Sequence, residues 1–290
     1  MQGAVDAAAD VAARLLPALR DRLAGLAGLL RLAEPPGPLD PFGMDPTLLD
    51  RAAPLLDFLY LTWWRVEATG TARVPAEGPA MVVANHGGTA PWDALVLRLA
   101  LRRDHPARRE IRPLLDEVAL GPPWLRRLAL RLGAVPATPE NALRILGEGG
   151  AVAVFPQGGA VRPWPLRYRI GAFGRGGFAK VALRAGAAVV PCGIVGSEEA
   201  SPPVGRAGFL ADALHLPLLA AAPALPFGPL GGLPLPARWS LRFGEPADLA
   251  TRGSGAAPDA EVVAGLAAGV RDCIQALVDE GLAARGSIYL

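Results

Sequence analysis

The spacing of hydrophobic positions changes near residue 66, and this change divides the chain into regions. Upstream, apolar residues recur every three or four positions over 4–32 and over about 46–66, which predicts two helical stretches. Downstream, short apolar runs alternate with longer stretches of helical spacing. Because strands that alternate with helices favour a largely parallel sheet covered on both faces, the pattern predicts an α/β fold with a mixed, largely parallel sheet.

The expected elements follow the apolar runs and the glycine and proline residues between them. We expect strands over 66–70, 80–85, 111–116, 151–156, 187–195 and 239–246. We expect helices over 93–103, 123–133, 140–150, 173–186 and 258–285. The stretch 201–237 is rich in proline and glycine and is expected to be a long irregular insertion.

These patterns predict three segments. Residues 1–58 form an N-terminal helical segment, 59–250 an α/β domain, and 251–290 a C-terminal helix packed on that domain. Two interpretations of 4–32 stay open. One is a helix that packs on the domain or on a partner, and the other is a helix that lies on a membrane with its arginines towards the lipid headgroups.

Composition narrows the class of protein. With 29 basic and 27 acidic residues the formal net charge is +2, which gives no reason to expect a nucleic-acid partner. Two cysteines are too few for a disulfide framework, and no Cys-x-x-Cys or His-Glu-x-x-His pattern indicates a metal site. The first residues lack the basic start of a signal peptide, and prolines break the longest apolar run. We therefore expect a cytoplasmic protein.

The stretch MVVANHGGTAPWDALVLRLAL (81–101) carries one of three histidines between an expected strand and an expected helix. Asn85 and His86 end the strand, at the edge where open α/β sheets bind ligands. Asp93 lies in the first turn of the helix, so the connecting loop can bring it back to His86. An acid that holds one ring nitrogen leaves the other nitrogen free as a base. The alternative is an isolated histidine, with Asp93 only favouring the helix dipole.

This stretch resembles the first motif of the glycerolipid acyltransferase family, whose members acylate glycerol-3-phosphate and lysophospholipids. The usual form has four residues between histidine and aspartate, whereas this chain has six, as in a bacterial branch with a longer NHxGxxPxD loop. Three further blocks follow in the family's order, so the resemblance covers roughly 60–250. They are FPQGG (155–159), VVPCGIVGSEE (189–199) and LRFGEP (241–246).

The resemblance implies an O-acyltransferase that moves a fatty acyl group from a thioester to the hydroxyl of a glycerolipid or lysophospholipid. His86 is then the general base and Asp93 its orienting acid. The donor is acyl-CoA or acyl-carrier protein, no other cofactor is needed, and the chain works peripherally at the inner face of the cytoplasmic membrane. Two alternatives stay open: a catalytically impaired lipid-binding protein, and a thioester or ester hydrolase.

The remaining candidate residues lie in or near the first motif and the FPQGG block. Gln157 stands where the family has a glutamate thought to hold the acceptor, which indicates a changed acceptor or weak activity. The N–H groups of Gly87, Gly88 and Gly158 are candidate donors to an oxyanion. Three arginines after the FPQGG block are candidates for binding phosphate of the donor or acceptor; they are Arg162, Arg167 and Arg175.

Two further stretches bear on the substrate. The region 131–141 lies where the family's second block falls. That block often carries a phosphate-binding arginine, but here Pro136, Ala137 and Thr138 occupy its neighbourhood without one. This absence indicates either an acceptor without phosphate or a phosphate that is bound by residues elsewhere in the chain. The basic run 101–112 is interpreted as a solvated helix end and loop, with contact to anionic headgroups as the alternative.

Overall fold

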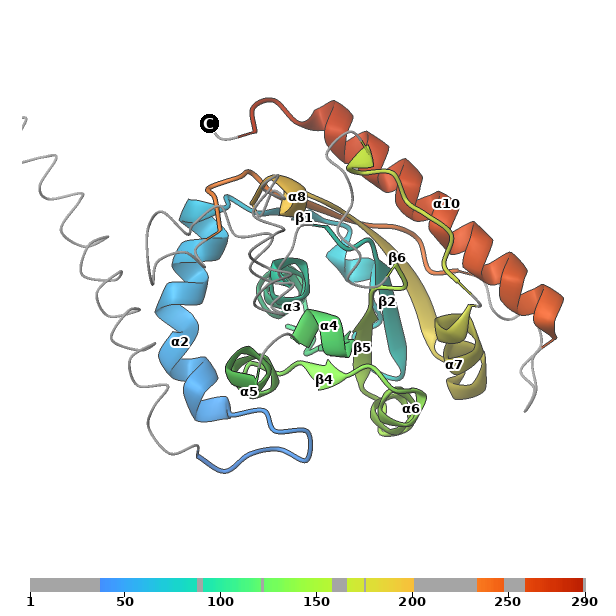
Figure 1. The fold of residues 1–290 in the computed structure, drawn as a ribbon, viewed down its shortest axis with the longest axis horizontal. Coiled ribbons are helices and arrows are strands. Elements are labelled where there is room, and N and C mark those ends of the chain that lie inside the picture. Colours follow the sequence, from blue (N-terminus) through green and yellow to red (C-terminus); the bar gives the residue numbers. More distant parts are fainter. Residues whose placement is uncertain are drawn as a thin grey trace, which may run out of the picture.

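A seven-stranded sheet runs through the part of the chain that the structure describes (Figure 1). The structure is a computed structural model, and it describes residues 37–87, 91–120, 123–157, 166–174, 176–200, 234–247 and 259–288. The strand order is β1-β7-β6-β2-β5-β3-β4. Every neighbouring pair is parallel except β6 and β7, so β1 and β7 run opposite to the other five strands. The predicted mixed, largely parallel sheet is confirmed.

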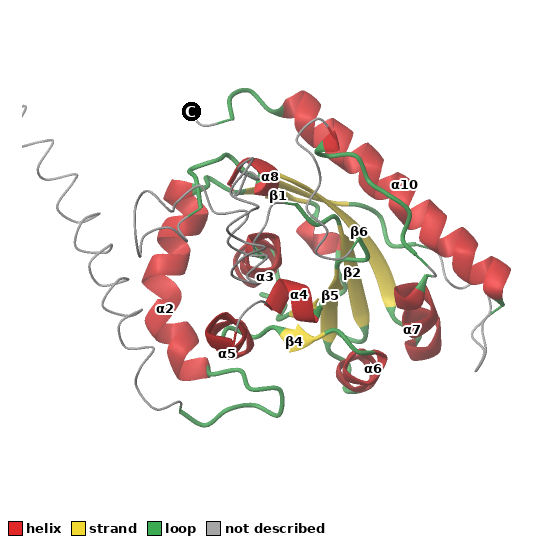
Figure 2. Ribbon diagram, viewed as in Figure 1, coloured by secondary structure: helices red, strands yellow, loops and turns green. Residues whose placement is uncertain are grey.

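The elements alternate along the chain (Figure 2). The strands are β1 (Glu67–Thr69), β2 (Ala80–Ala84), β3 (Arg112–Leu115), β4 (Val135–Pro136), β5 (Ala151–Val154), β6 (Ala188–Val195) and β7 (Ser240–Phe243). The α-helices are α2 (Pro46–Phe58), α3 (Trp92–Asp104), α4 (Glu117–Leu120), α5 (Pro123–Arg131), α6 (Pro139–Gly147), α7 (Gly177–Ala185), α8 (Ser197–Ala200) and α10 (Ala260–Ala284). A π-helix over Leu59–Trp63 extends α2, and a 3₁₀ turn covers Thr71–Arg73.

The sheet separates two hydrophobic cores, and β2 shows how. Val82 and Ala84 point to one face, where they pack in a core shared with α2 and α3. Met81 and Val83 point to the other face, in a core shared with α6, α7 and α10. All of β2 is buried, because a central strand covered on both faces contributes alternate side chains to each core. In Figure 1, α10 and α7 accordingly lie on the opposite side of the sheet from α2 and α3.

The start of α3 is anchored by aromatic packing. Trp64, which is fully buried, lies 5.7 Å from Trp92 and 5.4 Å from Trp239, measured between ring centroids. The backbone N–H of Trp239 also donates to the carbonyl of Trp64. Tilted aromatic pairs at these distances stabilise a core beyond the area they bury. Because Trp92 precedes Asp93, this cluster fixes the first turn of α3 relative to the sheet.

The structure differs from the sequence-based expectation in several places. β4 and α4 lie in 111–141 and were not predicted; each is at most four residues long, too short to show a period. The basic run 101–112 was predicted to be solvated, and this is wrong for His105, although the residues on either side of it are exposed. His105 is buried, with Nε2 2.8 Å from the carbonyl oxygen of Val74. Arg109 donates to three backbone carbonyls of two connecting segments, those of Ala76 and Gly78 before β2 and that of Gly149 before β5.

Two expectations fall outside the described residues: the helix over 4–32 and most of the insertion over 201–237. Within the described segments, no helix has the length and apolarity to span a bilayer. In the same segments, no three or more histidine, cysteine or acidic side chains gather where they could hold a metal ion.

Candidate active site

His86 and Asp93 meet at the carboxyl end of β2. Nδ1 of His86 lies 2.6 Å from Oδ2 of Asp93. The Asp93 side chain is fully buried and the His86 side chain is 10% exposed. Since a carboxylate can only accept, Nδ1 carries the proton of this hydrogen bond. Nε2 is then the basic nitrogen of the neutral imidazole.

The backbone supports Asp93 on both sides. Its Oδ2 also accepts from the N–H of Gly87 at 3.1 Å, and its Oδ1 accepts from the N–H of Ala94 at 2.8 Å. The carboxylate therefore sits in the first turn of α3, where the helix dipole favours negative charge. The N–H of Gly87 is engaged by Asp93 in this structure, so it stabilises the pair and does not face a substrate.

Asn85 joins the end of β2 to β6. Its Nδ2 donates to the carbonyl of Ile194 at 2.8 Å, and its Oδ1 accepts from the N–H of Ile194 at 2.7 Å. Both halves of the amide are thus used on one backbone residue, and Asn85 as a whole is 3% exposed. Asn85 was predicted to bind substrate, but these contacts instead fix the direction in which the chain leaves β2 towards His86.

Gln157 joins β5 to the same point. Its Oε1 accepts from the N–H of His86 at 3.3 Å. The sequence places Gln157 where the related family has a glutamate, and either side chain offers an oxygen for this bond. Gln157 therefore lies beside His86, as expected of a site residue, and its observed contact positions the backbone of His86.

Charge and burial act in opposite directions on the His86 ring. Burial acts to lower the pKa of His86, but the Asp93 carboxylate outweighs it through charge and hydrogen bonding, and Glu198 and Asp116 add smaller effects in the same direction. The net result is a pKa raised above its ordinary value of 6.5. A base with a raised pKa binds a proton more strongly, which suits the removal of a proton from a weakly acidic hydroxyl.

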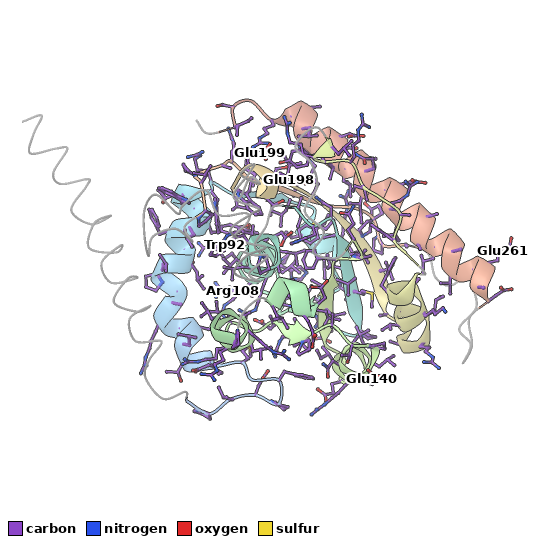
Figure 3. All side chains as sticks on the ribbon, in the orientation of Figure 1. Trp92, Arg108, Glu140, Glu198, Glu199 and Glu261 are labelled. Atoms are coloured by element: carbon purple, nitrogen blue, oxygen red, sulfur yellow. The ribbon has the colours of Figure 1, made fainter. Side chains whose placement is uncertain are left out.

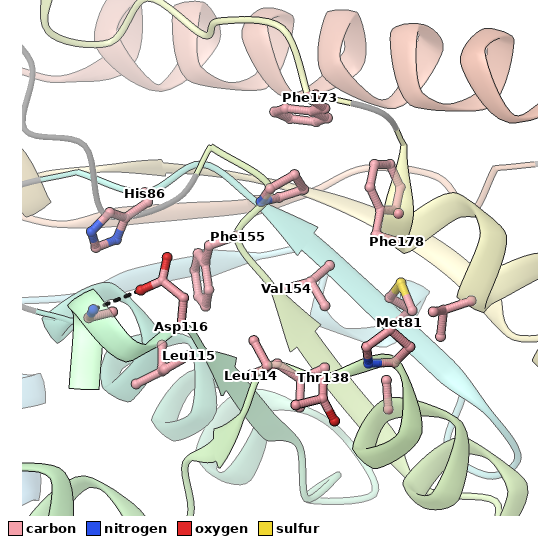
Figure 4. Close-up of a pocket in the computed structure, with 18 residues that line it drawn as sticks. Met81, His86, Leu114, Leu115, Asp116, Thr138, Val154, Phe155, Phe173 and Phe178 are labelled. Atoms are coloured by element: carbon pink, nitrogen blue, oxygen red, sulfur yellow. Dashed lines mark hydrogen bonds between the residues drawn. The ribbon is translucent and has the colours of Figure 1, made fainter.

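An apolar cavity of about 390 Å³ begins at His86 (Figure 4). It extends between the sheet, α6 and α7, and Phe155 packs edge-on against the imidazole with ring centroids 6.1 Å apart. Its lining is mostly aliphatic or aromatic and includes Met81, Leu114, Val154, Phe173, Phe178 and Val181. Such a space beside a basic nitrogen fits a hydrocarbon chain whose reactive end lies at His86.

Comparisons with known proteins relate the chain to one family and to mycobacterial relatives. The sequence model of the family described as Acyltransferase matches residues 65–195, which include His86, Asp93 and Gln157. An uncharacterized protein of Mycobacterium tuberculosis H37Rv is 40% identical over 255 residues, covering 87% of this chain and 71% of the relative. An uncharacterized protein of Mycobacterium leprae TN is 38% identical over 279 residues, 94% of this chain and 76% of the relative.

The chain belongs to the acyltransferase family. Among solved structures, the 1-acyl-sn-glycerophosphate acyltransferase PlsC from Thermotoga maritima shares the fold, with a TM-score of 0.51 and 20% identity over 83% of each chain. The family resemblance and the acyltransferase fold predicted from the four sequence blocks are confirmed. The roles of individual residues in this acyltransferase are argued below from geometry.

A buried ionic group of the acyltransferase lies behind the site, around α8. Tyr168 donates to Glu199 and accepts from the N–H of Gly196, while Arg285 donates to Glu199 at 2.9 Å. Burial, together with the Glu199 carboxylate, raises the pKa of Tyr168. Nε of Arg167 lies 3.9 Å from the same carboxylate, so this predicted phosphate-binding residue is next to an acid. Gly88, Gly158, Arg162 and Arg175 lie outside the described residues.

Sequence reasoning missed three acidic residues near the site. Glu198 and Glu199 lie in the short helix α8 (Figure 3), and both are buried. A Cβ added at Gly87 would lie 3.0 Å from Cγ of Glu198 and would collide with Oγ of Ser197. Asp116, at the end of β3, lines the cavity with His86. The sequence offered one indication of these acids, which is that each of them comes soon after a strand of the parallel part of the sheet.

Proposed function

We propose that this acyltransferase transfers a fatty acyl group from an acyl thioester to the hydroxyl of a glycerolipid or lysophospholipid, with His86 as the general base and Asp93 as its orienting acid. The observation that carries the proposal is one relationship: the ring held by Asp93 at 2.6 Å also lines the mouth of an apolar cavity. The acceptor hydroxyl would then lose its proton to His86 next to the cavity that holds the acyl chain.

The proposed reaction is a direct transfer without an acyl-enzyme. Nε2 of His86 takes the proton from the acceptor hydroxyl as its oxygen attacks the thioester carbonyl carbon. The C–S bond then breaks, and the imidazolium returns the proton to the leaving thiolate. Asp93 stabilises the positive ring between these two steps and keeps Nδ1 protonated throughout.

Burial supports transfer over hydrolysis. The imidazole side chain is 10% exposed, and Phe155 packs on its edge, so few directions are open to bulk water. A bound acyl chain in the cavity fills most of the remaining apolar space. The proposed donor is acyl-CoA or acyl-carrier protein with no other cofactor, and the acceptor is reached by peripheral contact with the inner face of the cytoplasmic membrane.

The test is incubation of the purified chain with radiolabelled acyl-CoA and a panel of lysophospholipids and acylglycerols, followed by separation of lipid products. Acylated lipid is the expected product. Free fatty acid alone indicates a hydrolase, and unchanged acyl-CoA indicates a binding protein. His86→Ala should abolish transfer, with circular dichroism and thermal unfolding as controls for the fold, and transfer at the wild-type rate contradicts the proposal.

A further inference from the structure

Asp116 is an acid in the active-site cavity that the proposed reaction does not use. It follows β3, and its Oδ1 accepts from the N–H of Ala119 at 2.7 Å, which caps α4. In Figure 4 its carboxylate points towards the His86 end of the cavity. Most of the cavity's other described lining residues are apolar, and Asp116 is the only acid among them.

The second oxygen of Asp116 is open to a ligand. The described residues make no hydrogen bond to the carboxylate other than that of Ala119, and Asp116 is only half-buried. An ionised carboxylate accepts hydrogen bonds and donates none. A ligand group that binds this second oxygen must therefore be a hydrogen-bond donor, such as a hydroxyl.

The charges around His86 also bear on whether the cavity can accept a phosphate. Among the described residues that line the cavity, none is lysine or arginine. Glu198 packs against Gly87, and Glu198 and Asp116 both act electrostatically on the His86 ring. A phosphate placed next to the reacting hydroxyl and beside Asp116 would meet that carboxylate, and like charges in contact are strongly disfavoured.

We propose that Asp116 selects an uncharged acceptor by accepting a hydrogen bond from a second hydroxyl next to the reacting one, and that it disfavours acceptors with a phosphate at that place. The inference rests on the proposed function, and it narrows the acceptor to a neutral, polyhydroxylated lipid such as a glycerol monoester. The α4 cap keeps Asp116 in place, so the second oxygen is available before the acceptor binds.

The test compares three acceptors with one acyl-CoA. They are 1-oleoylglycerol, 1-oleoylglycerol 3-phosphate, and a 1-oleoyl-1,2-propanediol that has the reacting hydroxyl but lacks the second one. The wild type should use 1-oleoylglycerol at least about tenfold better, in kcat/KM, than either of the others. Asp116→Asn retains a carbonyl oxygen for the α4 cap and removes the charge. It should raise the relative kcat/KM for the phosphate acceptor about tenfold.

Glu148→Gln is the matched control, because it removes one negative charge from an exposed position on the turn after α6 that does not line the cavity. It should leave the acceptor ratios unchanged. A wild type that prefers the phosphate acceptor, or an Asp116→Asn variant with wild-type ratios, overturns the assignment to Asp116 but leaves acyl transfer standing. Failure to acylate any of these acceptors or the lysophospholipid panel overturns both proposals.

Discussion

Oδ2 of Asp93 lies 2.6 Å from Nδ1 of His86, although the two residues are seven positions apart across the turn from β2 to α3. The contact is possible because two other elements fix that turn. Asn85 holds the end of β2 to β6, and Trp92 packs against Trp64 at the start of α3. The position of the proposed base thus depends on the sheet and the first helical turn together.

The pH dependence of transfer should report this contact. Because the pKa of His86 is raised above 6.5, the neutral base forms only as the pH rises through that higher value. The acid limb of log kcat/KM should therefore have its midpoint above 6.5 in the wild type. Asp93→Asn removes the largest raising influence, so the midpoint should move down while the plateau falls by about 10²-fold or more. A midpoint that does not move shows that the limb belongs to another group.

Gly87 should not tolerate a side chain. A Cβ at this position would collide with Ser197 Oγ and lie 3.0 Å from Glu198 Cγ. Gly87→Ala should therefore displace the turn that supports Asp93 and reduce kcat by tenfold or more, on the order of 1.4 kcal/mol. Ser197→Ala removes the colliding oxygen. The double variant should recover part of the lost rate, and strictly additive losses argue against the collision as the cause.

The apolar cavity should set the acyl-chain preference. Val181 of α7 lines the cavity, so Val181→Phe should shorten the space and shift the optimum of kcat/KM towards shorter acyl-CoA substrates. Lys180→Phe places the same new ring on the exposed neighbouring position and serves as control. Rates are measured for saturated acyl-CoA substrates of increasing length. Parallel profiles for wild type and Val181→Phe mean that the chain binds elsewhere.

The buried carboxylate of Asp45 should stabilise the junction of α2 and α5. It caps α2 by accepting from the N–H of Leu48, and it pairs with Arg131 at 2.7 Å. Burial acts to raise the pKa of Asp45, but the Arg131 hydrogen bond and charge and the backbone donors outweigh it, so the pKa is lowered below 3.8. Asp45→Ala should reduce the free energy of unfolding at neutral pH by about 2 kcal/mol.

The same pair predicts how this difference varies with pH. Since the folded-state pKa of Asp45 is lowered, its contribution is present above 3.8 and is lost as the pH falls through the folded value. Urea unfolding curves of wild type and Asp45→Ala should therefore converge below about pH 4. A difference that stays constant down to acid pH shows that the charge of Asp45 is not responsible.

The spacing of apolar residues predicted most strands and helices, because the helices have a clear period and the central strands are unbroken apolar runs. β2 and β6 are continuous apolar runs, as expected of strands buried on both faces. The reversal of β7 relative to β6 was not predictable, because the long connection between them hides the direction of return. Short elements such as β4 escaped detection for lack of a repeat.

The candidate site shows a similar division. His86 and Asp93 were predicted as a pair because they flank one turn, and a local contact is readable from spacing. The contacts of Asn85 with Ile194, and of Gly87 with Ser197, join segments more than one hundred residues apart. Side chains that support the site across the sheet, and acids such as Asp116 at neighbouring strand ends, become visible only when strand order is known.

The group formed by Tyr168, Glu199 and Arg285 links the end of α10 to the residues behind the candidate active site. Arg285 directly follows α10, yet its guanidinium neutralises a carboxylate one position beyond Glu198, which packs on Gly87. Any event that unwinds the end of α10, such as proteolytic nicking or a bulky fusion placed before Arg285, would remove the guanidinium that donates to Glu199 next to the turn that carries His86. The carboxyl-terminal helix is therefore a place from which catalysis could be impaired without any contact with substrate.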